Sequence, residues 1–152
     1  MQNLKKMKNK NIDTAVILAA GKGERISNTD GFIAKPLIKI FDVNLIERSI
    51  KNLINNLNVK KIYIVTGFNH EEINNHFVKL KNILSLNIEI VFAKDWEKGN
   101  GASFLAILDK INHQQFYLLM ADHLFNNEFY KAISKYKINN KSYLIISRTL
   151  ST

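Results

Sequence analysis

The chain has 152 residues, and 46% of them are hydrophobic, so it can bury the core of one ordinary domain and does not have the composition of a disordered tail. It contains no cysteine, which excludes disulfides and thiolate metal sites and suits a reducing, cytoplasmic compartment. The net charge of +9 suits a small anionic ligand; because there is no dense Lys/Arg stripe with interleaved aromatics, we expect no nucleic-acid partner.

The first thirteen residues differ in character from the rest of the chain. They carry four lysines among the first ten positions, and no apolar segment follows them as it would in a secretory signal. No apolar run approaches the roughly 20 residues that a membrane span needs. We therefore expect residues 1–13 to be a flexible basic lead-in and residues 14–152 to form one domain without a membrane span.

Strand and helix patterns alternate along the chain. Residues 14–20 are a continuous apolar run rich in β-branched side chains, as in a strand buried on both faces, and residues 45–57 carry one apolar helical stripe. The pattern then predicts strands at 61–67, 87–93, 115–121 and 142–148, and helices at 69–80, 101–111 and 127–136. This repetition predicts an α/β fold with a Rossmann-like, mostly parallel sheet and helices on both faces.

A glycine loop follows the first strand, at the edge where parallel sheets bind ligands. It begins "GKGER", but Ile26 stands where a dinucleotide fingerprint needs its third glycine, and the loop lacks the G-K-[ST] end of a P-loop. Gly21 and Gly23 allow backbone amides to approach an oxyanion without a Cβ in the way. The loop could equally be an ordinary flexible strand–helix turn.

Cationic side chains in and after this loop favour an anion site. Arg25 can grip phosphate oxygens as a fork, and Lys35 can act as a point charge. Pro36 predicts an extended Lys35, because the residue before proline avoids the helical region. The alternative is a set of solvated surface charges.

A second segment, "EKGNGASFLAIL", precedes the helix at 101–111. Asn100 offers a donor and an acceptor and can read a pyrimidine edge, Gly101 leaves room for a base, and Ser103 lies in the first helical turn. The alternative is a glycine turn that only caps the helix.

An acidic residue directly follows the strand at 115–121. Asp122 is a natural oxygen ligand for Mg²⁺, although it could be a surface acid in a turn. His123 could orient Asp122, contact a substrate or face solvent. We expect His70, His76 and His113 to be surface residues, because they have no metal-ligand spacing.

Several of these stretches together resemble a known superfamily. "LAAGKGERI", "AKPLIKI" and "LIERSIKNL" are similar to the start of the nucleoside-triphosphate transferases that activate sugar, polyol or choline phosphates. "EKGNGASFLAIL" followed by "MADHLF" most resembles the CTP:inositol-1-phosphate cytidylyltransferase family within it. Glu24 departs from the Ser or Thr that many members carry. The resemblance extends from about residue 14 to residue 148.

The resemblance implies a Mg²⁺-dependent transfer of CMP from CTP to a phosphorylated small alcohol such as inositol 1-phosphate, with release of pyrophosphate. Lys35 and Arg25 would be catalytic, Asp122 would hold the metal, and His123 could contact the acceptor. The nucleotide would be held by two sets of residues, Ala19, Ala20, Gly21, Lys22 and Gly23 in the loop and Asn100, Gly101 and Ser103 in the second segment.

Three alternatives to this function stay open. Choline-phosphate cytidylyltransferases and sugar-1-phosphate nucleotidyltransferases share the opening motif. Members are also typically longer than this chain, with later strands that complete the acceptor pocket, so the resemblance implies the N-terminal part of the domain, incomplete at the C-terminus. A non-catalytic nucleotide-binding module is the alternative of another class.

Overall fold

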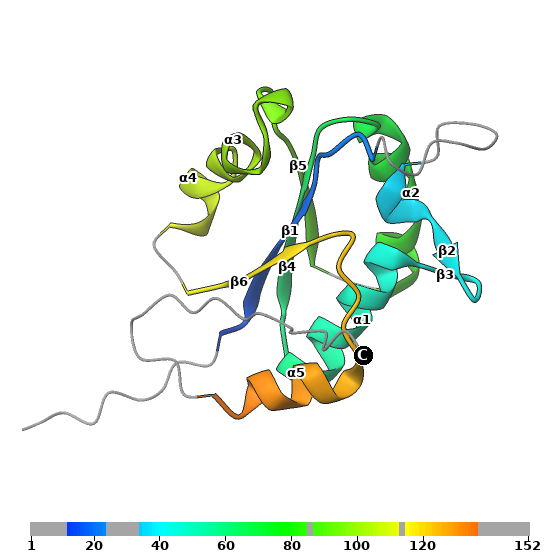
Figure 1. The fold of residues 1–152 in the computed structure, drawn as a ribbon, viewed down its shortest axis with the longest axis vertical. Helices are drawn as coiled ribbons and strands as arrows, with labels where there is room; N and C mark the ends of the chain where they lie inside the picture. Colours follow the sequence, from blue (N-terminus) through cyan, green and yellow to red (C-terminus); the bar gives the residue numbers. More distant parts are fainter. Residues whose placement is uncertain (1–11, 24–33, 85–86, 113–114, 137–152) are drawn as a thin grey trace, which may run out of the picture.

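The computed structural model describes residues 12–23, 34–84, 87–112 and 115–136. In these residues four parallel strands form one sheet in the order β5-β4-β1-β6 (Figure 1). The strands are β1 (Thr14–Ala19), β4 (Lys61–Thr66), β5 (Ile88–Phe92) and β6 (Tyr117–Met120). Four predicted strands are thus confirmed, each slightly shorter than expected. The strand predicted at 142–148 and residues 1–11 of the lead-in lie outside the described residues.

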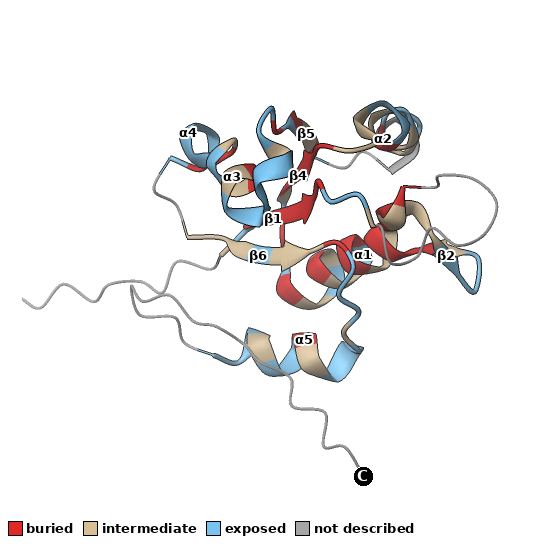
Figure 2. Ribbon diagram, turned by 45° about the horizontal axis from the view of Figure 1, so that its top comes forward, coloured by how far each residue is buried: buried red, intermediate tan, exposed pale blue. Residues whose placement is uncertain are grey.

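Helices cover both faces of the sheet. On one face lie α1 (Leu45–Leu57), α2 (His70–Leu84) and α5 (Asn127–Ser134), whose buried residues share a core cluster with Ile17 of β1. On the other face lie α3 (Asn100–Leu105) and α4 (Leu108–Ile111), where Ile107 and Ile111 pack with Val16 and Leu18. Figure 2 shows the central strands and the inner side of α1 as the buried part of the fold. Because successive residues of β1 enter opposite clusters, its sequence is apolar from Ala15 to Ala19.

The single helix predicted at 101–111 is wrong, because the structure divides it into α3 and α4. The amides of Ala106 and Ile107 donate to carbonyls three residues back, at Ser103 (3.3 Å) and Phe104 (3.1 Å), so the chain tightens there before α4 begins. Ile107 and Ile111 nevertheless stay on the buried side. The apolar spacing continues through the break, so the sequence pattern does not reveal it.

A short hairpin after the first loop was not predicted. Strands β2 (Lys39–Ile40) and β3 (Val43–Asn44) pair antiparallel around a two-residue turn. Both turn residues, Phe41 (φ 48°) and Asp42 (φ 62°), have left-handed backbone, the conformation of a type I′ hairpin. Asn-Gly is the usual signal for that turn, and "FD" lacks it.

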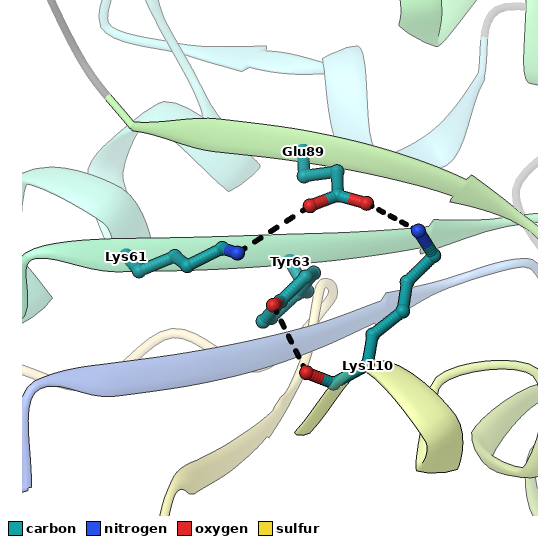
Figure 3. Close-up of polar contacts among 4 residues, drawn as sticks. All are labelled: Lys61, Tyr63, Glu89 and Lys110. Atoms are coloured by element: carbon teal, nitrogen blue, oxygen red, sulfur yellow. Dashed lines mark hydrogen bonds and ion pairs between the residues drawn. The ribbon is translucent and has the colours of Figure 1, made fainter. Parts of the chain in front are cut away.

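A polar network fastens α4 to the amino-terminal half of the sheet (Figure 3). Glu89 on β5 accepts from Lys110 Nζ at 2.6 Å and lies 3.5 Å from Lys61 Nζ. The buried Tyr63 donates its hydroxyl to the Lys110 carbonyl oxygen at 3.2 Å. The hydrogen bond from Lys110 outweighs the opposing effect of burial and lowers the pKa of Glu89. These contacts lie at the end of the sheet opposite to the predicted site.

Among the described helices, none is long and apolar enough to cross a membrane.

Candidate functional site

The carboxyl ends of the parallel strands bring four loop segments to one edge of the sheet. Residues 20–23 follow β1, residues 67–69 follow β4, residues 93–99 follow β5 and residues 121–123 follow β6. Backbone bonds continue the strand ladder into these segments, from Ala121 N–H to the Leu18 carbonyl (2.9 Å) and from Phe68 N–H to the Ala20 carbonyl (3.0 Å). The edge is therefore a continuous rim, where open α/β sheets bind ligands.

Lys35 and Asp122 meet at this rim although 87 positions separate them. Lys35 Nζ donates to Asp122 Oδ2 at 2.6 Å, and the two side chains are 28% and 35% exposed. Partial burial by itself would raise the pKa of Asp122, but the hydrogen bond and charge of Lys35 outweigh it and hold that pKa below its ordinary value. The structure thus supplies an ammonium and an ionised carboxylate that are both partly open to solvent.

The expectation that Lys35 is extended is wrong. Lys35 begins a short 3₁₀ turn, η2 (Lys35–Leu37), and the extended residue is Ala34 before it (φ −54°, ψ 118°). Leu37 N–H donates to the Ala34 carbonyl at 2.7 Å, and Ile38 N–H donates to the Lys35 carbonyl at 3.2 Å. Pro36 fits this first turn because its missing N–H has no intrahelical partner to lose.

The glycine loop packs against the stem of Lys35. Gly23 has a left-handed backbone (φ 70°), and a Cβ at this position would lie 3.0 Å from Lys35 Cβ. A side chain here would be both strained and crowded. Ala19 and Ala20 are buried, so any contact they make with a ligand would be through their backbone, whereas Gly21 and Lys22 are exposed.

The segment predicted to hold the base lies on the opposite face of the sheet from η2. Asn100 and Gly101 are exposed at the start of α3, which packs against β1 and β4. Ser103 is buried, and its hydroxyl donates to the Gly99 carbonyl oxygen at 3.2 Å. The Ser103 hydroxyl therefore closes the first helical turn.

His70 and His76, expected at the surface, are only partly exposed there, and each makes a polar contact. Thr66 Oγ1 lies 2.7 Å from His70 Nδ1 and 3.2 Å from the Val91 carbonyl oxygen. His76 Nε2 lies 2.8 Å from Glu47 Oε1, across the α1–α2 contact. Both rings are half-buried, held by residues from other elements or the preceding strand.

His123 lies beside Asp122 at the rim. Its side chain is 60% exposed, and its Nε2 atom lies 3.9 Å from Asp122 Oδ1. Arg25 and His113 lie outside the described residues.

Sequence reasoning missed four residues that shape this rim. Glu72 Oε2 accepts from Ala34 N–H at 3.2 Å and so holds the residue before Lys35. Gly67, Phe68 and Trp96 form a contact cluster between the glycine loop and the start of α3. The signal that could have found the cluster is "TGF", a glycine and an aromatic residue directly after a buried strand.

A magnesium ion brought by a nucleotide fits the donors at this rim. Mg²⁺ is commonly held by one or two carboxylates together with substrate phosphates, and Asp122 provides one partly exposed carboxylate. Within the described ranges, no three His, Cys, Asp or Glu side chains cluster as a metal site. Asp122 alone could therefore contribute one ligand to such an ion, with the phosphates supplying others.

A family model described as the MobA-like NTP transferase domain matches residues 15–146, which is most of the chain. The chain belongs to this family. A curated relative of this MobA-like NTP transferase, the bifunctional IPC transferase and DIPP synthase of Rubrobacter xylanophilus, is 32% identical over 94 residues, or 62% of the chain and 20% of the relative.

Solved structures share the fold of this NTP transferase domain. The inositol-1-phosphate CTP transferase from T. maritima is 21% identical with a TM-score of 0.71, over 88% of this chain and 51% of that one. A UDP-glucose pyrophosphorylase from Acinetobacter baumanii is 20% identical with a TM-score of 0.61, over 73% and 46%. The chain thus spans about half the length of these structures and a fifth of the curated relative.

Proposed function

We propose that this chain binds CTP at the carboxyl edge of its sheet and transfers CMP to a phosphorylated small alcohol of the inositol 1-phosphate type. The observation that carries the proposal is the Lys35–Asp122 pair, which lies 2.6 Å apart at the rim with the stem of Lys35 against Gly23. An ammonium, an ionised carboxylate and a glycine loop at one place are what a magnesium-bound triphosphate needs.

In the proposed reaction, a phosphate oxygen of the acceptor attacks the α-phosphorus of CTP. A new phosphorus–oxygen bond forms as the bond to the leaving oxygen breaks, and pyrophosphate departs. The protein must hold two anions that repel each other and neutralise the charge that accumulates between them. Lys35 would stand between the α-phosphate and the acceptor phosphate, while Lys22 and Arg25 would neutralise the β- and γ-phosphates.

Asp122 would hold Mg²⁺, which supplies positive charge beside the phosphates when bound. In the free protein Lys35 neutralises this carboxylate, so ligand binding would have to exchange one cationic partner of Asp122 for another. Asn100 and Gly101, both exposed at the start of α3, would contact the base. The His123 side chain is 60% exposed and would contact the acceptor.

Two observations support the choice of CTP and of an inositol phosphate. One is the G-N-G-x-S segment, and the other is the similarity to two proteins that are named as an IPC transferase and as an inositol-1-phosphate CTP transferase. Sugar-1-phosphate nucleotidyltransfer is the second candidate, because a UDP-glucose pyrophosphorylase matches the same fold at comparable identity. At 20–21% identity these two structural matches support the fold and do not decide between the two acceptors.

The test is pyrophosphate release from a panel of nucleoside triphosphates and phosphorylated acceptors, with magnesium present or chelated. We expect release from CTP with inositol 1-phosphate, and loss of release on chelation. Release only from UTP with a sugar 1-phosphate would replace the cytidylyl assignment by the second candidate. CTP binding without release, under every acceptor, would favour a nucleotide-binding module.

A further inference from the structure

We propose that Trp96 is a positioning residue, locked over Gly67, that sets the spacing between the glycine loop and the turn that begins α3. This inference rests on the function proposed above and assigns to one contact the control of nucleotide affinity. The contact lies at the carboxyl ends of β4 and β5, apart from Lys35 and Asp122.

The fit between Gly67 and Trp96 leaves no room for a side chain on the glycine. A Cβ built on Gly67 would lie 2.3 Å from Trp96 Cγ, 2.4 Å from Trp96 Cβ and 2.8 Å from Cδ2. These atoms belong to the base of the indole side chain, which cannot swing away as the end of a flexible chain could. Gly67 is buried, and its backbone does not require glycine, so the restriction comes from Trp96.

Phe68 connects this contact to the glycine loop. Its N–H donates to the Ala20 carbonyl at 3.0 Å, and the Lys22 ammonium lies 6.0 Å from the centre of its ring. The same ring lies 5.8 Å from the Trp96 ring, measured between centroids. A shift of Trp96 would therefore disturb Phe68, and through it the loop predicted to receive the phosphates.

Trp96 is also joined to the turn that precedes α3. It begins the 3₁₀ segment η3 (Trp96–Lys98), and its carbonyl accepts from Gly99 N–H at 3.1 Å. The Gly99 carbonyl in turn accepts from Ser103 N–H at 3.1 Å, so backbone hydrogen bonds connect the start of α3 to the same segment. Gly67, Phe68 and Trp96 thus link both sets of proposed nucleotide contacts, and moving one set would weaken nucleotide binding.

The test uses three variants, Gly67→Ala, Trp96→Gly and the double variant, with CTP and magnesium as the probe. We expect the Kd for CTP by calorimetry, and the KM, to rise at least about fivefold in both single variants, while kcat changes less than about twofold. The double variant should bind no worse than Trp96→Gly, because glycine removes the Cβ and Cγ atoms that the added methyl would otherwise meet. Phe116→Leu, which also trims an aromatic residue packed on this face, is the control and should keep the wild-type Kd.

Trp96 provides its own readout because it is the one tryptophan in the sequence. CTP should change the fluorescence of the wild type and of Phe116→Leu alike. If Gly67→Ala does not fold, Trp96→Gly and Trp96→Phe carry the test, with Phe expected to retain most of the affinity. Single variants that bind CTP like the wild type, or a double variant that adds both losses, would overturn the inference. A wild type that binds no nucleoside triphosphate would instead overturn the proposed function.

Discussion

Replacing Lys35 by methionine separates a catalytic role of its ammonium from a structural one. The pair with Asp122 is about one-third exposed on each side, and ion pairs in such positions contribute about 0–1 kcal/mol to stability. Methionine keeps an unbranched stem against Gly23, where alanine would also remove packing. We therefore expect Lys35→Met to change the free energy of unfolding by no more than about 1 kcal/mol, or about 2–4 °C in Tm.

The effect on turnover should be larger than the effect on stability. Loss of a contact to the charge that develops in the transition state lowers kcat at least about tenfold. This corresponds to about 1.4 kcal/mol of activation free energy. The assay is pyrophosphate release beside thermal unfolding of the same preparation, with Lys51→Met on the exposed side of α1 as the control for loss of one positive charge. Wild-type turnover in Lys35→Met, or a fall in Tm large enough to account for the lost activity, would contradict a catalytic role for the Lys35 ammonium.

Three further predictions concern stability. Phe77→Ala should cost about 3–5 kcal/mol in urea unfolding because Phe77 is fully buried, whereas the neighbouring, half-exposed Val78→Ala should change stability by under about 1 kcal/mol; equal effects would contradict the assigned face of α2. Since the pKa of Glu89 is lowered chiefly by the hydrogen bond from Lys110, its contribution is present above its ordinary pKa of 4.5 and is lost as pH falls through the lower value; Glu89→Gln should therefore lower stability at pH 7 by under about 1 kcal/mol and have no effect near pH 2. Tyr63→Phe should cost about 1 kcal/mol by removing the bond to the Lys110 carbonyl, and an unchanged urea midpoint would contradict that bond.

The burial of the first strand on both faces could be anticipated because such a strand carries a continuous apolar run. The run at 14–20 has no polar interruption, and the structure places it at the centre of the sheet with buried clusters on either side. Parallel strands then fix where their following residues lie. This is why the glycine loop and Asp122, which each directly follow a strand, could be expected at one edge of the sheet. The pairing of Lys35 with Asp122, 87 positions apart, is a finding of the structure.

Features that depend on a few backbone angles or on distant partners could not be anticipated. The division between α3 and α4 alters hydrogen bonds without altering the apolar spacing. The β2–β3 hairpin is built on left-handed Phe41 and Asp42, and Phe41 is not a typical turn residue. His76 is held by Glu47, 29 positions away on another helix, and helical periodicity contains no information about that contact.

The contact between Gly67 and Trp96 belongs to the same class. A glycine after a strand has several structural explanations, and only the position of the indole ring singles out the correct one. The missed contact is therefore a tertiary one, between segments that follow neighbouring strands β4 and β5.

The most direct measurement is a crystal structure of this chain with CTP and magnesium bound. We expect the triphosphate to lie between the Gly21–Gly23 loop and Lys35. The Lys35 ammonium should have left Asp122 for a phosphate oxygen, and the Asp122 carboxylate should contact the metal. A nucleotide bound away from the carboxyl edge of the sheet, with Lys35 and Asp122 still paired, would contradict this expectation.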